Sequence, residues 1–121
     1  MVVYRIEHFA DKRGIWHPNY ANAGIKQIEE ARKYHDRLRN PGIEFGVHVD
    51  RIDTPNLVCA FPSKEVLLHF TPKEVIRRLF TLGFVLVELD IKNCRAYGEY
   101  TQVIFDRQCI ELETILTIED I

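Results

Sequence analysis

The sequence predicts an α+β fold: an antiparallel or mixed sheet with two to three helices packed on one face, in a single domain over residues 1–121. Three observations support this expectation. Apolar residues recur at helical spacing over Thr71–Leu82, apolar and acidic residues alternate over Phe84–Ile91, and a second alternating run covers residues 101–106. Turn-forming residues separate the two alternating runs. The sequence therefore predicts a helix packed on a hairpin.

Both ends of that helix are marked by residues with known terminal preferences. Thr71 is expected to cap free backbone N–H groups, Pro72 suits the first helical position, and Glu74 completes a capping box. Gly83 follows the last apolar residue and can adopt the left-handed conformation that ends a helix.

The beginning of the chain combines a regular strand with an irregular loop. Residues 2–9 are rich in β-branched and aromatic side chains and predict a strand. Residues 10–22 contain turn formers and no hydrophobic period, so a loop is expected. Trp16, the one tryptophan of the chain, falls inside it. A loop of this length in a small domain is commonly functional.

The remaining elements follow from local patterns. A helix is expected over residues 23–40, with Asn22 as its cap and His35 in its buried stripe. The further expected elements are an edge strand or extended arm over 43–52, a short strand over 57–61, a brief helix capped by Ser63, and a continuation of the hairpin strand over 107–121. The sheet face away from the helices is expected to show Leu86, Ile104 or Ile115 among charged residues.

Composition excludes several classes of protein. A length of 121 residues, 46% of them hydrophobic and 28% charged, is typical of one globular domain. A net charge of −2 gives no large positive field for duplex DNA. No apolar run approaches the ~20 residues that a membrane span requires. Cys59, Cys94 and Cys109 have no metal-binding spacing and are expected as free thiols in a reducing cytoplasm.

No catalytic constellation is recognisable, so the chain is not expected to be an enzyme or to carry a cofactor. The sequence has no nucleophile motif, no Walker loop and no dinucleotide-binding glycine pattern. A metal site built from His8, His17 and His48 is conceivable, but scattered surface histidines explain these residues better. No metal is expected.

A ligand site is suggested by the loop that contains Trp16. An indole beside Arg13 and His17 could stack on a nucleobase, and the alternative is that it folds back over the core. Arginines near strand ends could converge with Arg13 on a phosphate, although each alone suits an ordinary surface position. Asn93 could contact a base or ribose, or simply permit its turn. The candidate ligand-binding residues are Trp16, Asn93, Arg13, His17, Arg51, Arg95 and Arg107.

The order of several short motifs resembles a known family. These are Tyr4–His8 followed by a glycine-containing loop, then Phe61–Ser63, Leu82–Phe84 and Gln102–Phe105. In this order they resemble the Thoeris anti-defence protein one family. Its members are phage "sponges" that sequester cyclic ADP-ribose isomers made by bacterial TIR-domain immune enzymes.

The resemblance implies a function and a set of partners. It implies a phage or prophage protein in the bacterial host cytoplasm that binds a cyclic ADP-ribose isomer tightly without cleaving it. It also implies a homodimer or higher homo-oligomer. Trp16 would stack on the adenine, and Asn93 would supply polar contacts near the end of the central strand.

Two other functions remain open from the sequence. One is a protein–protein inhibitor of a host defence complex, similar to anti-CRISPR factors, that uses its sheet face. The other is a small nucleotide hydrolase that depends on a metal held by the histidines.

Overall fold

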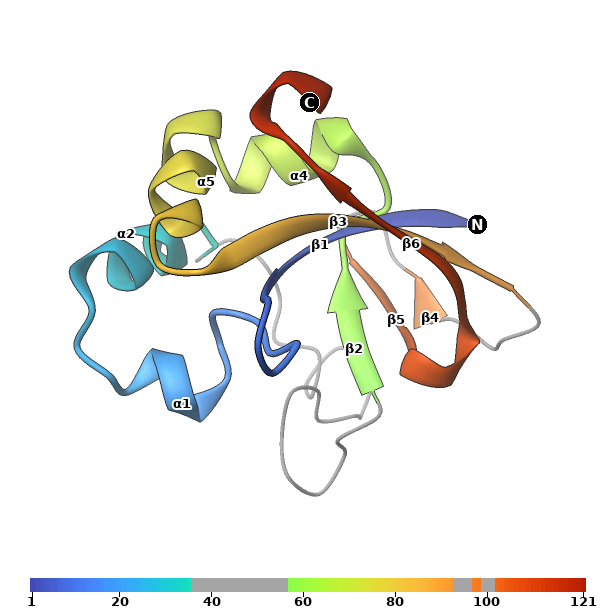
Figure 1. Ribbon diagram of the computed structural model, residues 1–121, viewed down its shortest axis with the longest axis horizontal. Coiled ribbons are helices and arrows are strands. Elements are labelled where there is room, and N and C mark those ends of the chain that lie inside the picture. The colour runs from blue at the N-terminus through green and yellow to red at the C-terminus, as the bar shows by residue number, and fades with distance from the viewer. Residues whose placement is uncertain (36–56, 93–96, 99–101) are drawn as a thin grey trace.

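The computed structural model describes residues 1–35, 57–92, 97–98 and 102–121 (Figure 1). The strands pair antiparallel and helices pack beside them, so the predicted α+β class is confirmed. The strand expected over 43–52 and the predicted helix beyond His35 lie outside the described residues. In chain order the elements are β1 (Val2–His8), α1 (Pro18–Ala21), α2 (Lys26–Tyr34), β2 (Leu57–Ala60), α4 (Lys64–Phe70), α5 (Lys73–Phe80), β3 (Phe84–Ile91), β4 (Tyr97–Gly98), β5 (Val103–Asp106), the 3-10 helix η1 (Arg107–Cys109), β6 (Ile110–Leu116) and the 3-10 helix η2 (Ile118–Asp120).

The strands form two sheets rather than one. β3 lies between β1 and β6 in the first sheet, and β5 lies between β2 and β4 in the second. An isolated bridge between Tyr4 and Phe61 connects the two sheets. The predicted hairpin of β3 with β5 is therefore wrong, because these strands belong to different sheets.

A short turn explains why the last strand does not continue β5. The Asp106 carboxylate accepts a hydrogen bond from the Gln108 N–H at 2.9 Å and caps η1. This turn redirects the chain, and β6 pairs antiparallel with β3, with Leu116 opposite Leu86. The expected continuation of the hairpin strand over 107–121 is wrong for the same reason.

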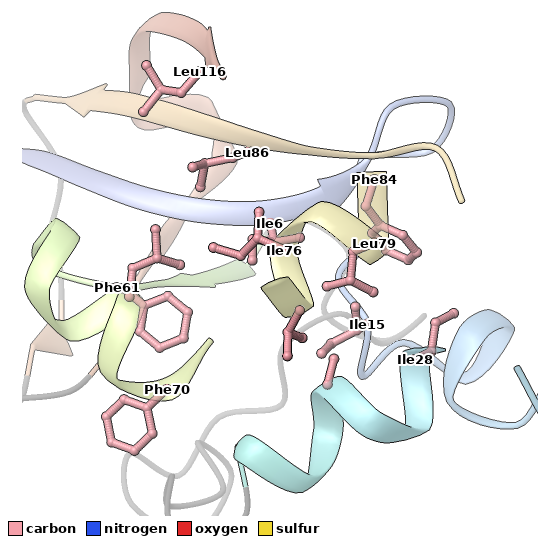
Figure 2. Packing of buried hydrophobic residues seen from close by; sticks show 13 residues of the cluster. Ile6, Ile15, Ile28, Phe61, Phe70, Ile76, Leu79, Phe84, Leu86 and Leu116 are labelled. Atoms are coloured by element: carbon pink, nitrogen blue, oxygen red, sulfur yellow. The ribbon is translucent and has the colours of Figure 1, made fainter. Parts of the chain in front are cut away.

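Helices and the second sheet cover opposite faces of the β1–β3–β6 sheet (Figure 1). On the helix side, a buried cluster includes Ile6, Phe84 and Leu86, which lie against side chains of α2, α4 and α5 (Figure 2). Between the two sheets, a second cluster includes Val87 of β3 and Phe105 of β5. Alternation along β3 thus sends neighbouring side chains into two different cores.

The expected open apolar face is not present in the form predicted. Leu86 and Ile104 are both fully buried, and Leu86 lies in the cluster beneath the helices. Ile115 is 66% exposed, on the edge strand β6.

The helix starts show one correct and two wrong assignments. Asn22 ends α1 and does not cap α2, whose N-cap is Ile25. The Ser63 hydroxyl accepts from the Val66 N–H at 3.1 Å, so Ser63 caps α4 as predicted. Thr71 does not cap α5, whose N-cap is Pro72 with no side-chain hydrogen bond. Thr71 instead ends α4, and its hydroxyl lies 2.7 Å from Nε2 of His35.

Gly83 ends α5 in the left-handed region, with φ of 91°. A Cβ at this position would also lie 2.8 Å from Nε2 of His8. Glycine is therefore required for both its backbone conformation and the approach of β1.

The cysteines differ in state. Cys59 is a free, partly buried thiol that donates to the side-chain oxygen of Gln102 at 3.0 Å. Cys109 is disulfide-bonded, so the expectation of a free thiol is wrong at this position.

Candidate functional site

The loop after β1 is anchored at the backbone carbonyl of Lys12. Nη2 of Arg107 donates to this oxygen at 2.9 Å, and Nη2 of Arg5 donates to it at 3.3 Å. The backbone closes the turn, because His8 N–H donates to the Arg13 carbonyl at 2.8 Å. Lys12 itself has a φ of 63°, which is uncommon for a residue with a side chain. The chain leading to Trp16 is thus fixed to the sheet.

Trp16 presents about half of its side chain to solvent, with 47% exposed. Its Nε1–H donates to Nδ1 of His35 at 3.2 Å, and the two rings lie 6.4 Å apart at 29°. The guanidinium carbon of Arg32 lies 4.4 Å from the centre of the indole, a distance typical of a cation–π contact. The neighbouring Ile15 is buried in the helix-side core, which holds the backbone beneath the ring.

His35 joins the loop to the end of α4. It is 7% exposed, and its Nε2 lies 2.7 Å from the hydroxyl of the fully buried Thr71. The imidazole also contacts Phe61 edge to face at 5.8 Å. These contacts hold the imidazole in one position. Trp16, Arg32, His35 and Thr71 are called the Trp16 site below.

Arg32 is positioned by its own helix and by the chain that precedes it. It lies three residues before His35, so both side chains leave the same side of α2. Its Nη1 donates to the carbonyl of Ala21, the last residue of α1, at 2.8 Å. One guanidinium therefore bridges two helices and covers the indole.

Three members of this site were not predicted from the sequence, namely Arg32, His35 as a ring partner, and Thr71. The burial of His35 was predicted from helical spacing and is confirmed. Its pairing with Trp16 and Thr71 spans 19 and 36 positions, and no local pattern encodes such a separation. The spacing of Arg32 and His35 was the one available signal.

The other predicted site residues occupy different environments. His17 is buried, and its Nδ1 accepts from Asn19 N–H at 3.2 Å, which caps α1. Arg13 is half-buried, and no hydrogen bond or ion pair of its side chain occurs with the described residues. Asn93, Arg51 and Arg95 lie outside the described residues.

Arg107 belongs to a separate cluster on the other side of β1. Glu7 is fully buried, with Arg5 at 3.7 Å and Arg107 at 3.6 Å from its carboxylate. Neither carboxylate oxygen accepts a hydrogen bond from the described residues. Burial raises the pKa of Glu7, and the two guanidinium groups partly oppose that rise. Arg5, Glu7 and Arg107 are called the buried ion cluster below.

An apolar groove and an open strand edge lie away from both clusters. The groove runs between α5 and the end of β6 and is lined by Phe80, Phe84, Val85, Ile115 and Leu116, among others. Within the described residues, β6 pairs with β3 alone, and its central side chains are exposed.

Among the described residues, features of a membrane span and of a metal site are both absent. None of their helices has the length and apolar character that crossing a bilayer requires. No group of three or more His, Cys, Asp or Glu side chains in the same part of the chain could hold a metal ion.

The fold and site define an α+β domain that presents a half-exposed indole, held by a buried histidine and covered by an arginine. Over residues 1–119 the chain matches the family described as "Bacteriophage T4 Y00F protein". The match covers nearly the whole chain, so the protein belongs to this family and is a phage protein, as the resemblance implied. No curated protein and no solved structure matches it.

Proposed function

We propose that this phage protein sequesters a cyclic ADP-ribose-type nucleotide made by TIR-domain defence enzymes, in the cytoplasm of the bacterial host. The observation that supports the proposal is the Trp16 ring, which is half exposed yet held by a hydrogen bond and a cation–π contact. An aromatic ring held in this way is a ready surface for a purine, because its orientation is fixed before the ligand arrives.

Charge near the ring suits a nucleotide diphosphate. The Arg32 guanidinium lies against the indole, and the Arg13 side chain, three residues before Trp16, is not committed to a described partner. Guanidinium groups bind phosphate through paired N–H donors. In this proposal the adenine stacks on Trp16 while Arg13 or Arg32 contacts the diphosphate.

The proposed activity is binding without turnover. A protein that removes a signal needs affinity rather than a catalytic group, so the proposal includes no enzyme activity, no cofactor and no metal. It also includes a homodimer or higher homo-oligomer, because a second subunit would let so small a domain enclose more of the ligand.

Calorimetry with cyclic ADP-ribose isomers tests the proposal. We expect tight binding to at least one isomer and release of ligand of unchanged mass after heat denaturation. Trp16→Ala should weaken binding roughly five- to hundredfold, while Trp16→Phe, which keeps an aromatic face, should lose much less. Release of a cleaved product would replace the sponge with an enzyme, and absence of binding to every isomer would refute the proposal.

The open edge of β6 supports a second candidate, a protein–protein inhibitor of a host defence complex. Leu112 and Ile115 are 62% and 66% exposed on this edge strand, and Ile115 also lines the apolar groove. An exposed strand edge can pair with a strand of another protein. In an infection assay, this candidate predicts that Leu112→Ser with Ile115→Ser abolishes protection of the phage, whereas Trp16→Ala preserves it. The sponge predicts the reverse.

A further inference from the structure

His35 is connected on both sides of its ring. Nδ1 accepts the indole N–H of Trp16, and Nε2 lies at hydrogen-bond distance from the Thr71 hydroxyl. An indole N–H is a donor only, so Nδ1 must carry a lone pair and not a proton. The neutral form with hydrogen on Nε2 is the form that satisfies both contacts, because Nε2–H then donates to Thr71.

Protonation removes this arrangement. In the imidazolium both ring nitrogens are donors, and Nδ1–H would face the indole N–H of Trp16. The hydrogen bond that holds Trp16 would be replaced by a repulsive contact. The Thr71 contact would survive, because it already uses Nε2–H as donor. Protonation therefore acts on the loop side of His35 and not on the helix side.

We infer that His35 is a positioning residue for Trp16, and that its protonation releases the indole and weakens ligand binding at this site. Histidine ordinarily changes charge between about pH 5 and 8, which is the range over which the inference is tested. The ligand part of this inference rests on the proposed function. The positioning part concerns the free protein alone.

The groups around His35 favour this role. Among the described residues, its neighbours are Trp16 from the loop, Arg32 from α2, Phe61 beyond β2 and Thr71 at the end of α4. Arg32 is the charged group of this set, and its guanidinium covers the indole. A positive imidazole would meet that cation across the ring, which adds to the release of Trp16.

The free protein provides a direct test, because Trp16 is the sole tryptophan and its fluorescence reports on this one site. Long-range proton–nitrogen NMR spectra at pH 8 should show His35 with hydrogen on Nε2. Acidification should change the Trp16 fluorescence with the same midpoint as the His35 NMR signals. Hydrogen on Nδ1 at pH 8, or a fluorescence change that does not follow His35, would overturn the inference.

Two variants separate positioning from mere proximity. His35→Gln offers one acceptor and one donor without a charge change, so its Trp16 fluorescence should not titrate. His17→Asn removes the adjacent histidine while keeping a side-chain acceptor for the α1 cap, so its titration should match the native chain. Persistence of the titration in a folded His35→Gln variant would overturn the inference. If that variant does not fold, the NMR measurement on the native chain and the titration of His17→Asn decide whether His35 positions Trp16.

The ligand part uses cyclic ADP-ribose isomers as probes. Affinity of the native chain should fall about fivefold from pH 8 to pH 5.5, the effect of one lost hydrogen bond, and affinity of His35→Gln should stay constant. A constant affinity in the native chain would refute regulation of the site. If no isomer binds at any pH, the proposed function fails, while the NMR and fluorescence results still decide on the positioning role.

Discussion

Two polar clusters lie on opposite sides of β1, and they differ in how their charges and hydrogen bonds are satisfied. In the Trp16 site, neutral donors and acceptors meet in sequence from the indole through His35 to Thr71. In the buried ion cluster, Glu7 is fully enclosed between two guanidinium groups, and its oxygens accept no hydrogen bond from the described residues. The first cluster presents a ring to solvent, and the second fixes the backbone that leads to that ring.

The difference separates two contributions to one loop. Hydrogen bonding to neutral groups orients a side chain at small net free energy, about 1 kcal/mol per bond. Burying charge is unfavourable unless the geometry is very good, so the ion cluster is expected to matter most when one partner is removed. Both clusters end on the segment between Lys12 and Trp16. Variants in the ion cluster should therefore act first on the stability of this segment, and variants in the Trp16 site first on the position of the ring.

The largest effect is expected for Arg5→Met. Arg5 donates to the Cys59 carbonyl at 2.7 Å and to the Lys12 carbonyl, and it faces Glu7. Its removal leaves two carbonyls without this donor and Glu7 with one fewer cation. The free energy of unfolding, measured in urea, should therefore fall by about 3 kcal/mol. Arg107→Met is the matched control, since its side chain is more exposed. We expect it to lower the free energy of unfolding by about 1 kcal/mol. Equal losses for the two variants would contradict the assignment of Arg5 as the central partner.

The next largest effect is expected for Thr71→Val. This change keeps the shape of a fully buried side chain and removes the hydroxyl beside His35. A buried donor left without its acceptor costs about 2 kcal/mol, and the fluorescence of Trp16 should shift because its histidine partner is less firmly held. Thr71→Ser keeps the hydroxyl, so its free energy of unfolding should fall by only about 1 kcal/mol and its Trp16 fluorescence should not change. An unchanged fluorescence in Thr71→Val would show that the two ends of the chain of hydrogen bonds are not coupled.

Elements defined by local chemistry were predictable from the sequence, and their partners were not. β3, the Ser63 cap and the glycine at the end of α5 each follow from neighbouring residues. The pairing of β3 with β6 does not follow, because β5 and β6 both alternate and a period of two residues does not identify the strand opposite. The capped turn at Asp106 separates the two strands and was the missed signal.

The Trp16 site shows the same limit at the level of side chains. Thr71 has the residue type and position of a helix cap, and a tertiary contact with His35 uses its hydroxyl instead. Arg107 was a reasonable phosphate ligand near a strand end, yet its guanidinium is engaged by Glu7 and the Lys12 carbonyl. In both cases a distant partner decides the role of a residue whose local context suggested another.

The smallest expected effect is a difference in pH dependence between the native chain and Glu7→Gln. Burial raises the pKa of Glu7 above its ordinary value of 4.5, against the lowering by Arg5 and Arg107. The folded chain therefore holds the proton more tightly than the unfolded chain. The stability associated with that proton is complete below pH 4.5 and is lost as pH rises through the raised pKa. Glutamine cannot titrate, so the melting temperature of the native chain relative to Glu7→Gln should fall as pH rises from 4.5 to 7.

A matched control separates burial from charge pairing. Glu113 is a carboxylate on β6 with 31% of its side chain exposed, and it pairs with Lys12 at 3.4 Å. Glu113→Gln should lower the free energy of unfolding at pH 7 by less than about 1 kcal/mol, because an exposed pair contributes little. If the native chain instead gained stability over Glu7→Gln with rising pH, attraction by the guanidinium groups would outweigh desolvation. The buried ion cluster would then stabilise the loop as an ion pair. Its contrast with the hydrogen bonds of the Trp16 site would lie in exposure rather than in the sign of the electrostatic contribution.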